Sequence, residues 1–272
     1  MTNEGNAGGA VALTETAGDF ATHVFAVADA EVRKLLHDPW EVFSRAVQPV
    51  LWLVLFGEVM ARVRGITSGG VRYLDFLAPG ILAQSVLFVS IFYGISAIWE
   101  RDLGVLHRYM VSPAPRSALV LGKALSSSVR ALTQALVVYV CAFMLGVQLS
   151  FSLEHIAVVV VLIALGSGLF STFSLIIACI VKTRERFMGI GQVLTMPIFF
   201  ASNAIYPIGL MPGWLKAVAV ANPLTYEVDG LRAMMLAGGA SVFGLQIDFL
   251  ALVAALAVLV AIATRLYPRL TQ

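Results

Sequence analysis

Few residues of this sequence could support covalent chemistry, and the pattern closest to a nucleotide-binding motif is incomplete. An ATPase phosphate loop needs G-x-x-x-x-G-K-[ST], in which backbone N–H groups cradle the phosphates and the last hydroxyl binds Mg²⁺. The segment from Ser117 to Ala124 contains Gly122-Lys123. However, Ser117 stands where the first glycine belongs, and Ala124 stands where the hydroxyl residue belongs. The sequence therefore predicts that this chain does not itself hydrolyse ATP.

No other residue set predicts a catalytic or metal site. Gly166-Ser167-Gly168 has a faint likeness to a membrane serine hydrolase. A nucleophilic serine needs a base within hydrogen-bond reach, and no histidine lies deep in an apolar run. The four histidines lack metal-ligand spacing, and Cys141 and Cys179 lie in apolar runs as small core residues do. We expect no cofactor or metal on this chain, and an intramembrane hydrolase is kept as a remote alternative.

Three polar residues inside apolar runs are the best candidates for a binding function. Glu58 lies near one end of the first run, and Arg130 and Gln134 lie one turn apart in the third. A charge inside a bilayer is costly, so such residues commonly face a substrate path or a water-filled cavity. We expect a polar patch along a transport path. Two structural explanations stay open, a local Glu58–Arg62 pair and an Arg130 side chain that reaches back to the interface.

The composition requires these residues to be positioned by membrane helices. Of the 272 residues, 59% are hydrophobic and only 12% are charged, and the mean hydropathy is +0.89. Soluble domains carry about 45–50% apolar and about 25% charged residues, so a soluble fold could not cover its surface with so few charges. The net charge of +2 forms no basic stripe, and no nucleic-acid binding is expected.

Six apolar stretches approach the ~20 residues that a helix needs to cross a bilayer. We therefore predict an all-α, polytopic membrane protein in which residues 23–272 form one domain. The predicted spans are 46–63, 76–99, 119–147, 155–181, 188–210 and 247–267.

The segment before the first span differs from the spans. Residues 1–22 are small and polar, and we expect a disordered cytoplasmic tail. Residues 24–38 form an amphipathic helix that would rest in the membrane interface, with one apolar face that includes Phe25, Val32, Leu35 and Leu36. With the N-terminus inside, twelve Lys and Arg residues fall on the inner side and five on the outer side. This bias predicts that both termini are cytoplasmic.

The region between the fifth and sixth spans, residues 212–238, contains two short helical stretches. The first opens at Pro212 and ends at Asn222-Pro223, and the second ends at Gly238-Gly239. Each has about 10 to 14 residues, which is too short to cross a bilayer. Such half-helices can dip into the membrane if protein packs around them. We predict a re-entrant hairpin, and a plain extracellular loop helix stays open as the alternative.

The loop of residues 100–113 carries an apolar stripe. Leu103, Leu106 and Met110 have helical spacing, and Pro113 and Pro115 end the helix. On the charge bias this loop is cytoplasmic. A short amphipathic helix there could lie on lipid or dock into a groove of a partner protein, and the spacing alone does not choose between them.

Four segments together resemble the permease subunits of ABC-2 type exporters, in the branch of drug-resistance and nodulation-factor exporters. The resemblance covers nearly everything after about residue 25. The segments are Tyr73-Leu74-Asp75-Phe76-Leu77-Ala78-Pro79-Gly80-Ile81, the loop from Glu100 to Pro113 continuing to Gly122-Lys123, Pro212-Gly213-Trp214-Leu215, and Asn222-Pro223-Leu224-Thr225-Tyr226-Glu227-Val228-Asp229-Gly230-Leu231-Arg232.

The resemblance implies specific partners and roles. Such permeases pair as dimers, here expected to be homodimers, and bind two copies of a separate ATPase subunit that holds ATP and Mg²⁺. Residues 24–38 would be the elbow helix. The coupling helix seated in the ATPase would include Leu103, Gly104, Leu106, His107 and Met110. The re-entrant element would include Asn222, Pro223, Asp229 and Arg232.

These observations together favour an exporter permease in a bacterial inner membrane. The expected cargo is hydrophobic or amphipathic, such as a drug, a lipid or a glycolipid. It would leave the cytoplasm or the inner leaflet at the expense of ATP hydrolysed by the partner. An ion-coupled secondary transporter is the main alternative, although only Glu58 and Arg130 come close to the intramembrane charges that such proteins use.

Overall fold

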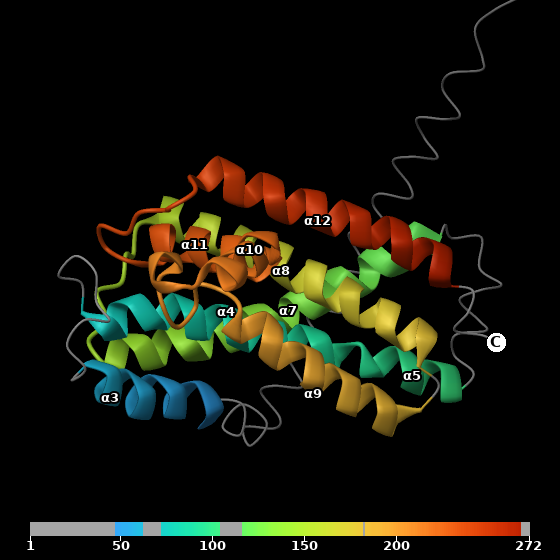
Figure 1. Ribbon diagram of the computed structural model, residues 1–272. Helices are drawn as coiled ribbons and strands as arrows, with labels where there is room; N and C mark the ends of the chain where they lie inside the picture. Colours follow the sequence, from blue (N-terminus) through green and yellow to red (C-terminus); the bar gives the residue numbers. More distant parts are fainter. Residues whose placement is uncertain (1–46, 62–71, 104–115, 182, 268–272) are drawn as a thin grey trace, which may run out of the picture.

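The computed structural model describes residues 47–61, 72–103, 116–181 and 183–267. These residues form helices and no β-strand, which confirms the predicted all-α class for this part of the chain. Four long helices run side by side (Figure 1), namely α4 (Tyr73–Tyr93), α7 (Arg116–Met144), α8 (Leu153–Ile180) and α12 (Leu245–Leu266).

Shorter elements complete the bundle. They are η1 (Trp52–Phe56), α3 (Gly57–Ala61), α5 (Ile95–Asp102), α9 (Arg184–Phe200), η2 (Ile208–Leu210), α10 (Gly213–Ala221) and α11 (Pro223–Met235). Helix α5 extends α4 after Gly94, while α11 packs against α4, α8 and α12. Helix α11 therefore lies among the long helices, whereas α10 contacts α11 and leaves Trp214, Val218 and Val220 exposed.

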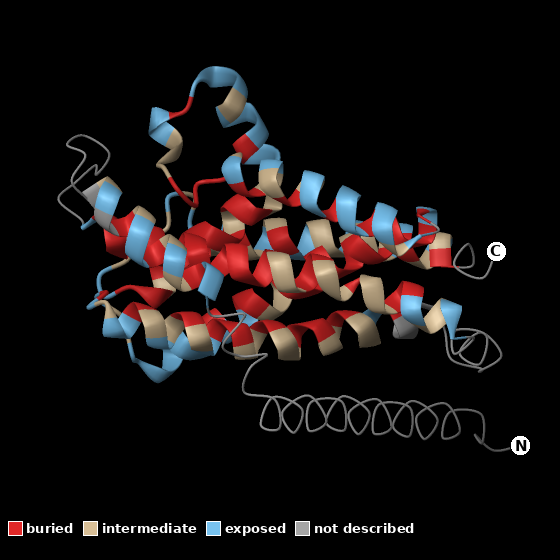
Figure 2. Ribbon diagram, turned by 90° about the horizontal axis from the view of Figure 1, so that it is seen from below, coloured by how far each residue is buried: buried red, intermediate tan, exposed pale blue. Residues whose placement is uncertain are grey.

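Four stretches are long and apolar enough to cross a membrane. They match the predicted spans 76–99, 119–147, 155–181 and 247–267, and their bounds are Tyr73–Asp102, Val120–Met144, Leu153–Ile180 and Leu245–Leu266. Large apolar side chains on the outside of the bundle fit this reading, since Leu136, Phe143 and Leu250 are 66%, 63% and 70% exposed. Figure 2 shows that buried residues gather along the middle of the bundle and exposed ones on its outer faces.

The other two predicted spans are not confirmed as crossings. Helix α9 has 17 residues and ends at Phe200, although the prediction extended it to residue 210. At about 1.5 Å per residue it is about 25 Å long, and Pro197 near its end lacks the N–H that would continue the helical ladder. In the first predicted span, residues 52–56 wind as a π-helix before α3. The predicted tail, residues 1–22, and the elbow helix, residues 24–38, lie outside the described residues.

Small residues bring α4, α7 and α8 close together. The Ser167 hydroxyl of α8 lies 2.9 Å from the Ser90 hydroxyl of α4 and 2.9 Å from the Ser127 hydroxyl of α7. Ser174 donates to the carbonyl oxygen of Ile91, and the same serine leaves no room for a side chain at Gly94. Because these hydroxyls bond to one another inside the bundle, they satisfy each other where water is absent. These serines therefore serve helix packing.

The first turns of α4 anchor two segments that are distant in the sequence. The Tyr73 hydroxyl donates to the carbonyl oxygen of Ile205 at 2.9 Å. The Asp75 carboxylate accepts from the N–H of Gln148 at 3.1 Å. Gly80 lies so close to the backbone of Ala204 that a Cβ at residue 80 would overlap it. The N-terminal part of α4 thus holds the irregular chain after α9 and the loop between α7 and α8.

We expect Gly80→Ala to destabilise the protein by about 1–3 kcal/mol, since an added methyl group would push against backbone atoms that cannot rotate away. The matched control is Gly168→Ala in α8, where the nearest atom to a new Cβ is 3.8 Å away. Thermal unfolding in detergent would be followed by maleimide labelling of the buried Cys179 in a Cys141→Ala background. Equal unfolding temperatures for the two variants would contradict this packing.

Candidate functional site

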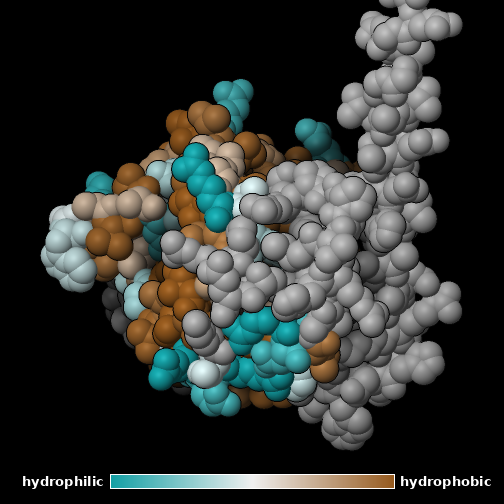
Figure 3. Space-filling view, turned by 90° about the vertical axis from the view of Figure 1, so that its right-hand side faces the viewer, coloured by the Kyte–Doolittle hydropathy of each residue, from teal (hydrophilic) through white to brown (hydrophobic). Residues whose placement is uncertain are grey.

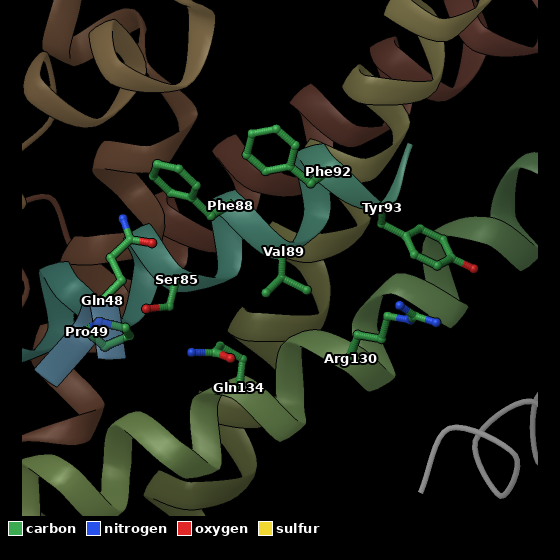
Figure 4. A pocket seen from close by; sticks show the side chains of 9 residues that line it. All are labelled: Gln48, Pro49, Ser85, Phe88, Val89, Phe92, Tyr93, Arg130 and Gln134. Carbon is green, nitrogen blue, oxygen red and sulfur yellow. The ribbon is translucent and has the colours of Figure 1, made fainter. Parts of the chain in front are cut away.

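A cavity of about 380 Å³ lies between α4, α7 and the chain just before η1. It runs along α4, with residues 48 and 49 at one end and Arg130 beside Tyr93 at the other (Figure 4). Its lining mixes polar and aromatic side chains, and the residues are Gln48, Pro49, Ser85, Phe88, Val89, Phe92, Tyr93, Arg130 and Gln134.

The cavity contains two of the three intramembrane polar residues predicted from the sequence. Arg130 and Gln134 project from α7 toward α4, and Ser85 lies across from Gln134 (Figure 4). The guanidinium carbon of Arg130 is 5.2 Å from the centre of the Tyr93 ring, a distance at which a cation is attracted to the aromatic face. The structure therefore places Arg130 and Gln134 in one pocket, and their role in a transport path stays a prediction.

The third predicted polar residue, Glu58, stays a prediction. Glu58 lies on α3, and its side chain is outside what the structure describes, as is Arg62. Sequence reasoning also missed two polar residues that do line the pocket, Gln48 and Ser85. Neither residue carries a charge, so they are recognised as pocket residues only from their position across from α7 in the structure.

The break between α10 and α11 is stabilised by one side chain. The Asn222 side-chain oxygen accepts from the N–H of Leu224 at 3.0 Å and so caps α11. Its amide nitrogen donates to the carbonyl oxygens of Ile198 at 2.7 Å and Ala201 at 3.1 Å. Pro223 occupies the first position of α11, where the absence of an N–H costs nothing. Asn222 thus joins the start of α11 to the end of α9.

Arg232 joins α11 to the chain that follows α9. Its guanidinium donates to the carbonyl oxygen of Asn203 at 2.9 Å and stacks 3.9 Å from the centre of the Phe76 ring. The carbonyl oxygen of Phe76 lies 3.4 Å from the same nitrogen. The planar guanidinium suits this combination of stacking and hydrogen bonding, which a lysine could not reproduce.

Asp229 joins the same helix to the chain before α12. One carboxylate oxygen lies 2.8 Å from the Ser241 hydroxyl and accepts from the N–H groups of Val242 and Phe243 at 2.7 and 3.0 Å. The Ser241 hydroxyl also lies 2.9 Å from a carboxylate oxygen of Asp248. The hydrogen bonds of Arg232 and Asp229 thus reach two separate loops.

Glu227 is the buried charge of α11 that the sequence did not single out as a site. Its side chain is fully buried, and no described residue donates to either carboxylate oxygen. The carboxylate fills the space that a side chain at Gly166 would occupy. The available signal was the glycine in the apolar α8 stretch, which marks a close approach by another element.

Ion pairs connect three helices at the end of the bundle where α5, α7 and α9 meet. Lys123 lies 2.7 Å from the Glu100 carboxylate, and Arg184 lies 2.8 Å from Asp102. The Arg184 guanidinium also stacks 3.6 Å from the centre of the Trp99 ring. Figure 3 looks onto this end and shows hydrophilic side chains gathered there among apolar ones. The chain leading to residue 103 is therefore fixed to both α7 and α9.

The predicted partner-binding segment begins directly beyond these ion pairs. Leu103 is described and is 70% exposed. The rest of the predicted coupling set, Gly104, Leu106, His107 and Met110, lies outside the described residues. The same holds for the predicted elbow residues Phe25, Val32, Leu35 and Leu36. Both assignments stay predictions.

Comparison with known proteins decides the family. Residues 22–236 match the model of the ABC-2 type transporter family. The chain belongs to this family. It is 30% identical to the transport permease ycf38 of Cyanophora paradoxa, over 78% of this chain and 74% of that protein.

Two further relatives fall in the predicted branch of the ABC-2 family. The daunorubicin resistance ABC transporter permease protein DrrB1 of Streptomyces coeruleorubidus is 24% identical over 73% of this chain and 70% of its own length. Nodulation protein J of Rhizobium meliloti is 25% identical over 77% and 79%. The resemblance to drug-resistance and nodulation exporters is thereby confirmed. Permeases of the ABC-2 family normally work with a separate ATP-binding subunit.

We expect Asn222→Asp to damage this ABC-2 permease at least as much as Asn222→Ala. An aspartate keeps the oxygen that caps Leu224 but loses both amide hydrogens, and it turns a charge toward the carbonyl oxygens of Ile198 and Ala201. The loss should be about 1–3 kcal/mol, measured as a lower unfolding temperature by labelling of Cys179. If Asn222→Asp were as stable as the parent, the cap alone would explain Asn222, and the tie to α9 would be refuted.

Proposed function

We propose that this protein is the permease subunit of an ATP-driven exporter that moves a hydrophobic or amphipathic compound out of the cytoplasm or the inner leaflet. The family match over residues 22–236 carries the proposal, because it spans every described element before α12. The cavity at Arg130 supports it, since a mixed polar and aromatic lining suits an amphipathic cargo. Drugs, lipids and glycolipids all fit such a path.

The proposed arrangement is a multi-pass protein of the bacterial cell membrane with six crossings and both termini in the cytoplasm. Residues 46–63 and α9 supply the two crossings beyond the four long apolar stretches. Helices α10 and α11 form the re-entrant hairpin at the outer side. Its insertion is supported by the burial of α11 residues such as Leu224, Val228 and Leu231, each 0% exposed.

The proposed engine is a separate ATPase subunit that binds ATP and Mg²⁺, two copies of which serve two permease protomers in a homodimer. This chain is then a transport subunit and not an enzyme. A displacement of residues 104–115 by the ATPase would be transmitted to the membrane helices through the ion pairs that precede this segment. The pair of Asp102 with Arg184 connects it to α9. Lys123 and Glu100 do the same for α7.

An ion-coupled secondary transporter is the second candidate, and one observation favours it. Glu227 is buried without a donor from any described residue, and buried carboxyl groups in membranes commonly relay protons. The other buried acids that the structure describes each have a donor, since Asp229 and Asp248 bond to Ser241 and Asp75 accepts from the N–H of Gln148. Export driven by a proton gradient alone, in vesicles without any ATPase, would establish this alternative and refute the ABC exporter.

We expect Leu106→Asp and Met110→Asp to abolish ATPase assembly or stimulation while membrane insertion stays intact. A carboxylate on the apolar stripe would oppose docking into a groove of the partner. The permease would be co-expressed with its ATPase subunit, assembly would be measured by pull-down, and ATP hydrolysis would be measured in liposomes. The matched control is Leu153→Asp, the same change at a residue that is 84% exposed at the start of α8.

The control should assemble and stimulate hydrolysis like the parent. If both loop variants assembled and transported normally, the coupling assignment of residues 103–110 would be wrong. If Leu153→Asp failed equally, general damage by an added acid would explain the loss.

A further inference from the structure

The charge in the cavity lies deep in the bundle. Arg130 is ten residues from Val120, where the apolar stretch of α7 begins. At about 1.5 Å per residue this is about 15 Å, half of the ~30 Å hydrocarbon thickness. An arginine at this depth is costly unless it faces polar surroundings. The cavity supplies part of these polar surroundings.

The residues that the structure describes around the cavity offer hydrogen-bond donors and a positive charge but no carboxylate. Of the nine lining residues that the structure describes, Arg130 is the one charged residue. A guanidinium has five N–H donors, so it can hold a ligand together with another partner. Its planar fork matches carboxylate, phosphate and sulfonate groups. The Gln134 amide, one turn away on α7, adds further donors.

The rest of the wall suits an apolar body. The Phe88 and Phe92 rings of α4 lie with their centres 5.9 Å apart, and Val89 points toward α7 between Ser85 and Tyr93 (Figure 4). A volume of about 380 Å³ lies at the small end of the range for ligand pockets, roughly 300–1,000 Å³. It fits a ring system or part of an acyl chain together with one head group.

We propose that this cavity binds an amphiphile with a single anionic group, seated on Arg130, and an apolar body along Phe88 and Phe92. The inference rests on the proposed transport function and adds the charge of the cargo to it. A cationic amphiphile would instead meet the guanidinium with like charge, which disfavours its binding.

Three ligands that share one pyrene body but differ in the charge of the head group test the proposal. The purified permease, in nanodiscs of phosphatidylcholine and without any ATPase, would be titrated with pyrenebutyrate, neutral pyrenebutanol and pyrenebutyl-trimethylammonium. Binding to empty nanodiscs would be subtracted. We expect pyrenebutyrate to bind at least about tenfold more tightly than the trimethylammonium compound. Equal or tighter binding of the cation would overturn the proposal. This comparison uses the parent protein alone, so it does not depend on whether a variant folds.

Variants locate the binding. Arg130→Gln should weaken pyrenebutyrate binding by about tenfold to a hundredfold and leave pyrenebutanol binding unchanged, and Arg130→Lys should retain part of the preference. The matched control is Arg265→Gln, at an exposed position of α12 away from the cavity, which should bind like the parent. If Arg130→Gln folded and bound pyrenebutyrate like the parent, the site would lie elsewhere.

A last arm separates the two sources of such a ligand. If phosphatidylglycerol in the nanodiscs displaces pyrenebutyrate, the natural ligand is an anionic lipid. If Arg130-dependent binding persists, it is a water-borne anionic amphiphile. Both results support the anionic class. Because binding is measured without the ATPase, its failure is distinguishable from a failure of the coupling test at Leu106 and Met110.

Discussion

The structure depends on hydrogen-bond partners for the backbone groups at helix ends within an apolar bundle. Where α10 ends and α11 begins, and again where α9 ends, backbone N–H and C=O groups lose their helical partners. An unpaired backbone group in such surroundings costs several kcal/mol. The Asn222 side chain meets three of these groups at once, one at the start of α11 and two at the end of α9. The two breaks are therefore stable only together.

The same requirement explains why residues from distant parts of the chain converge on α11. Arg232 donates to the carbonyl oxygen of Asn203, while Asp229 accepts from two backbone N–H groups that precede α12. Because Gly80 has no side chain, the irregular chain after α9 can approach α4. Because Gly166 has none, Glu227 can approach α8. Helix α11, the end of α9 and the start of α12 are thus tied into one unit. In a transporter, such a unit would move as a whole when α9 is pulled from its other end through Arg184.

Regular features of the fold could be predicted from the sequence, whereas its irregular ones depend on distant partners. Hydropathy located the four long helices because length and apolar composition are local properties. The helical spacing of Arg130 and Gln134 placed them on one face, and the structure shows them in one cavity. The end of α9 at Phe200 was missed, because the apolar residues after it continue the pattern. The ending is stabilised in part by Asn222, more than twenty residues later in the sequence.

Charged residues show the same division. Asp229 and Arg232 were recognised as a motif, yet their partners Ser241 and Asn203 are 12 and 29 residues away and carry no sequence signal of their own. Gln48 and Ser85 join the cavity solely because the segment before η1 and α4 happen to meet α7. A single sequence reveals which residues are unusual. The fold decides which of them are neighbours.

The central claim is that the break at Asn222 lies within the membrane. The most direct measurement is the depth of a spin label at Val220→Cys, beside the break, in liposomes with Cys141 and Cys179 replaced by alanine. The account predicts frequent collisions with oxygen and few with a water-soluble nickel chelate, in contrast to a reference label at Val242→Cys, which replaces a residue 73% exposed in the loop before α12. Nickel collisions at Val220 as frequent as at Val242 would place the end of α10, beside the break, in water and contradict the account.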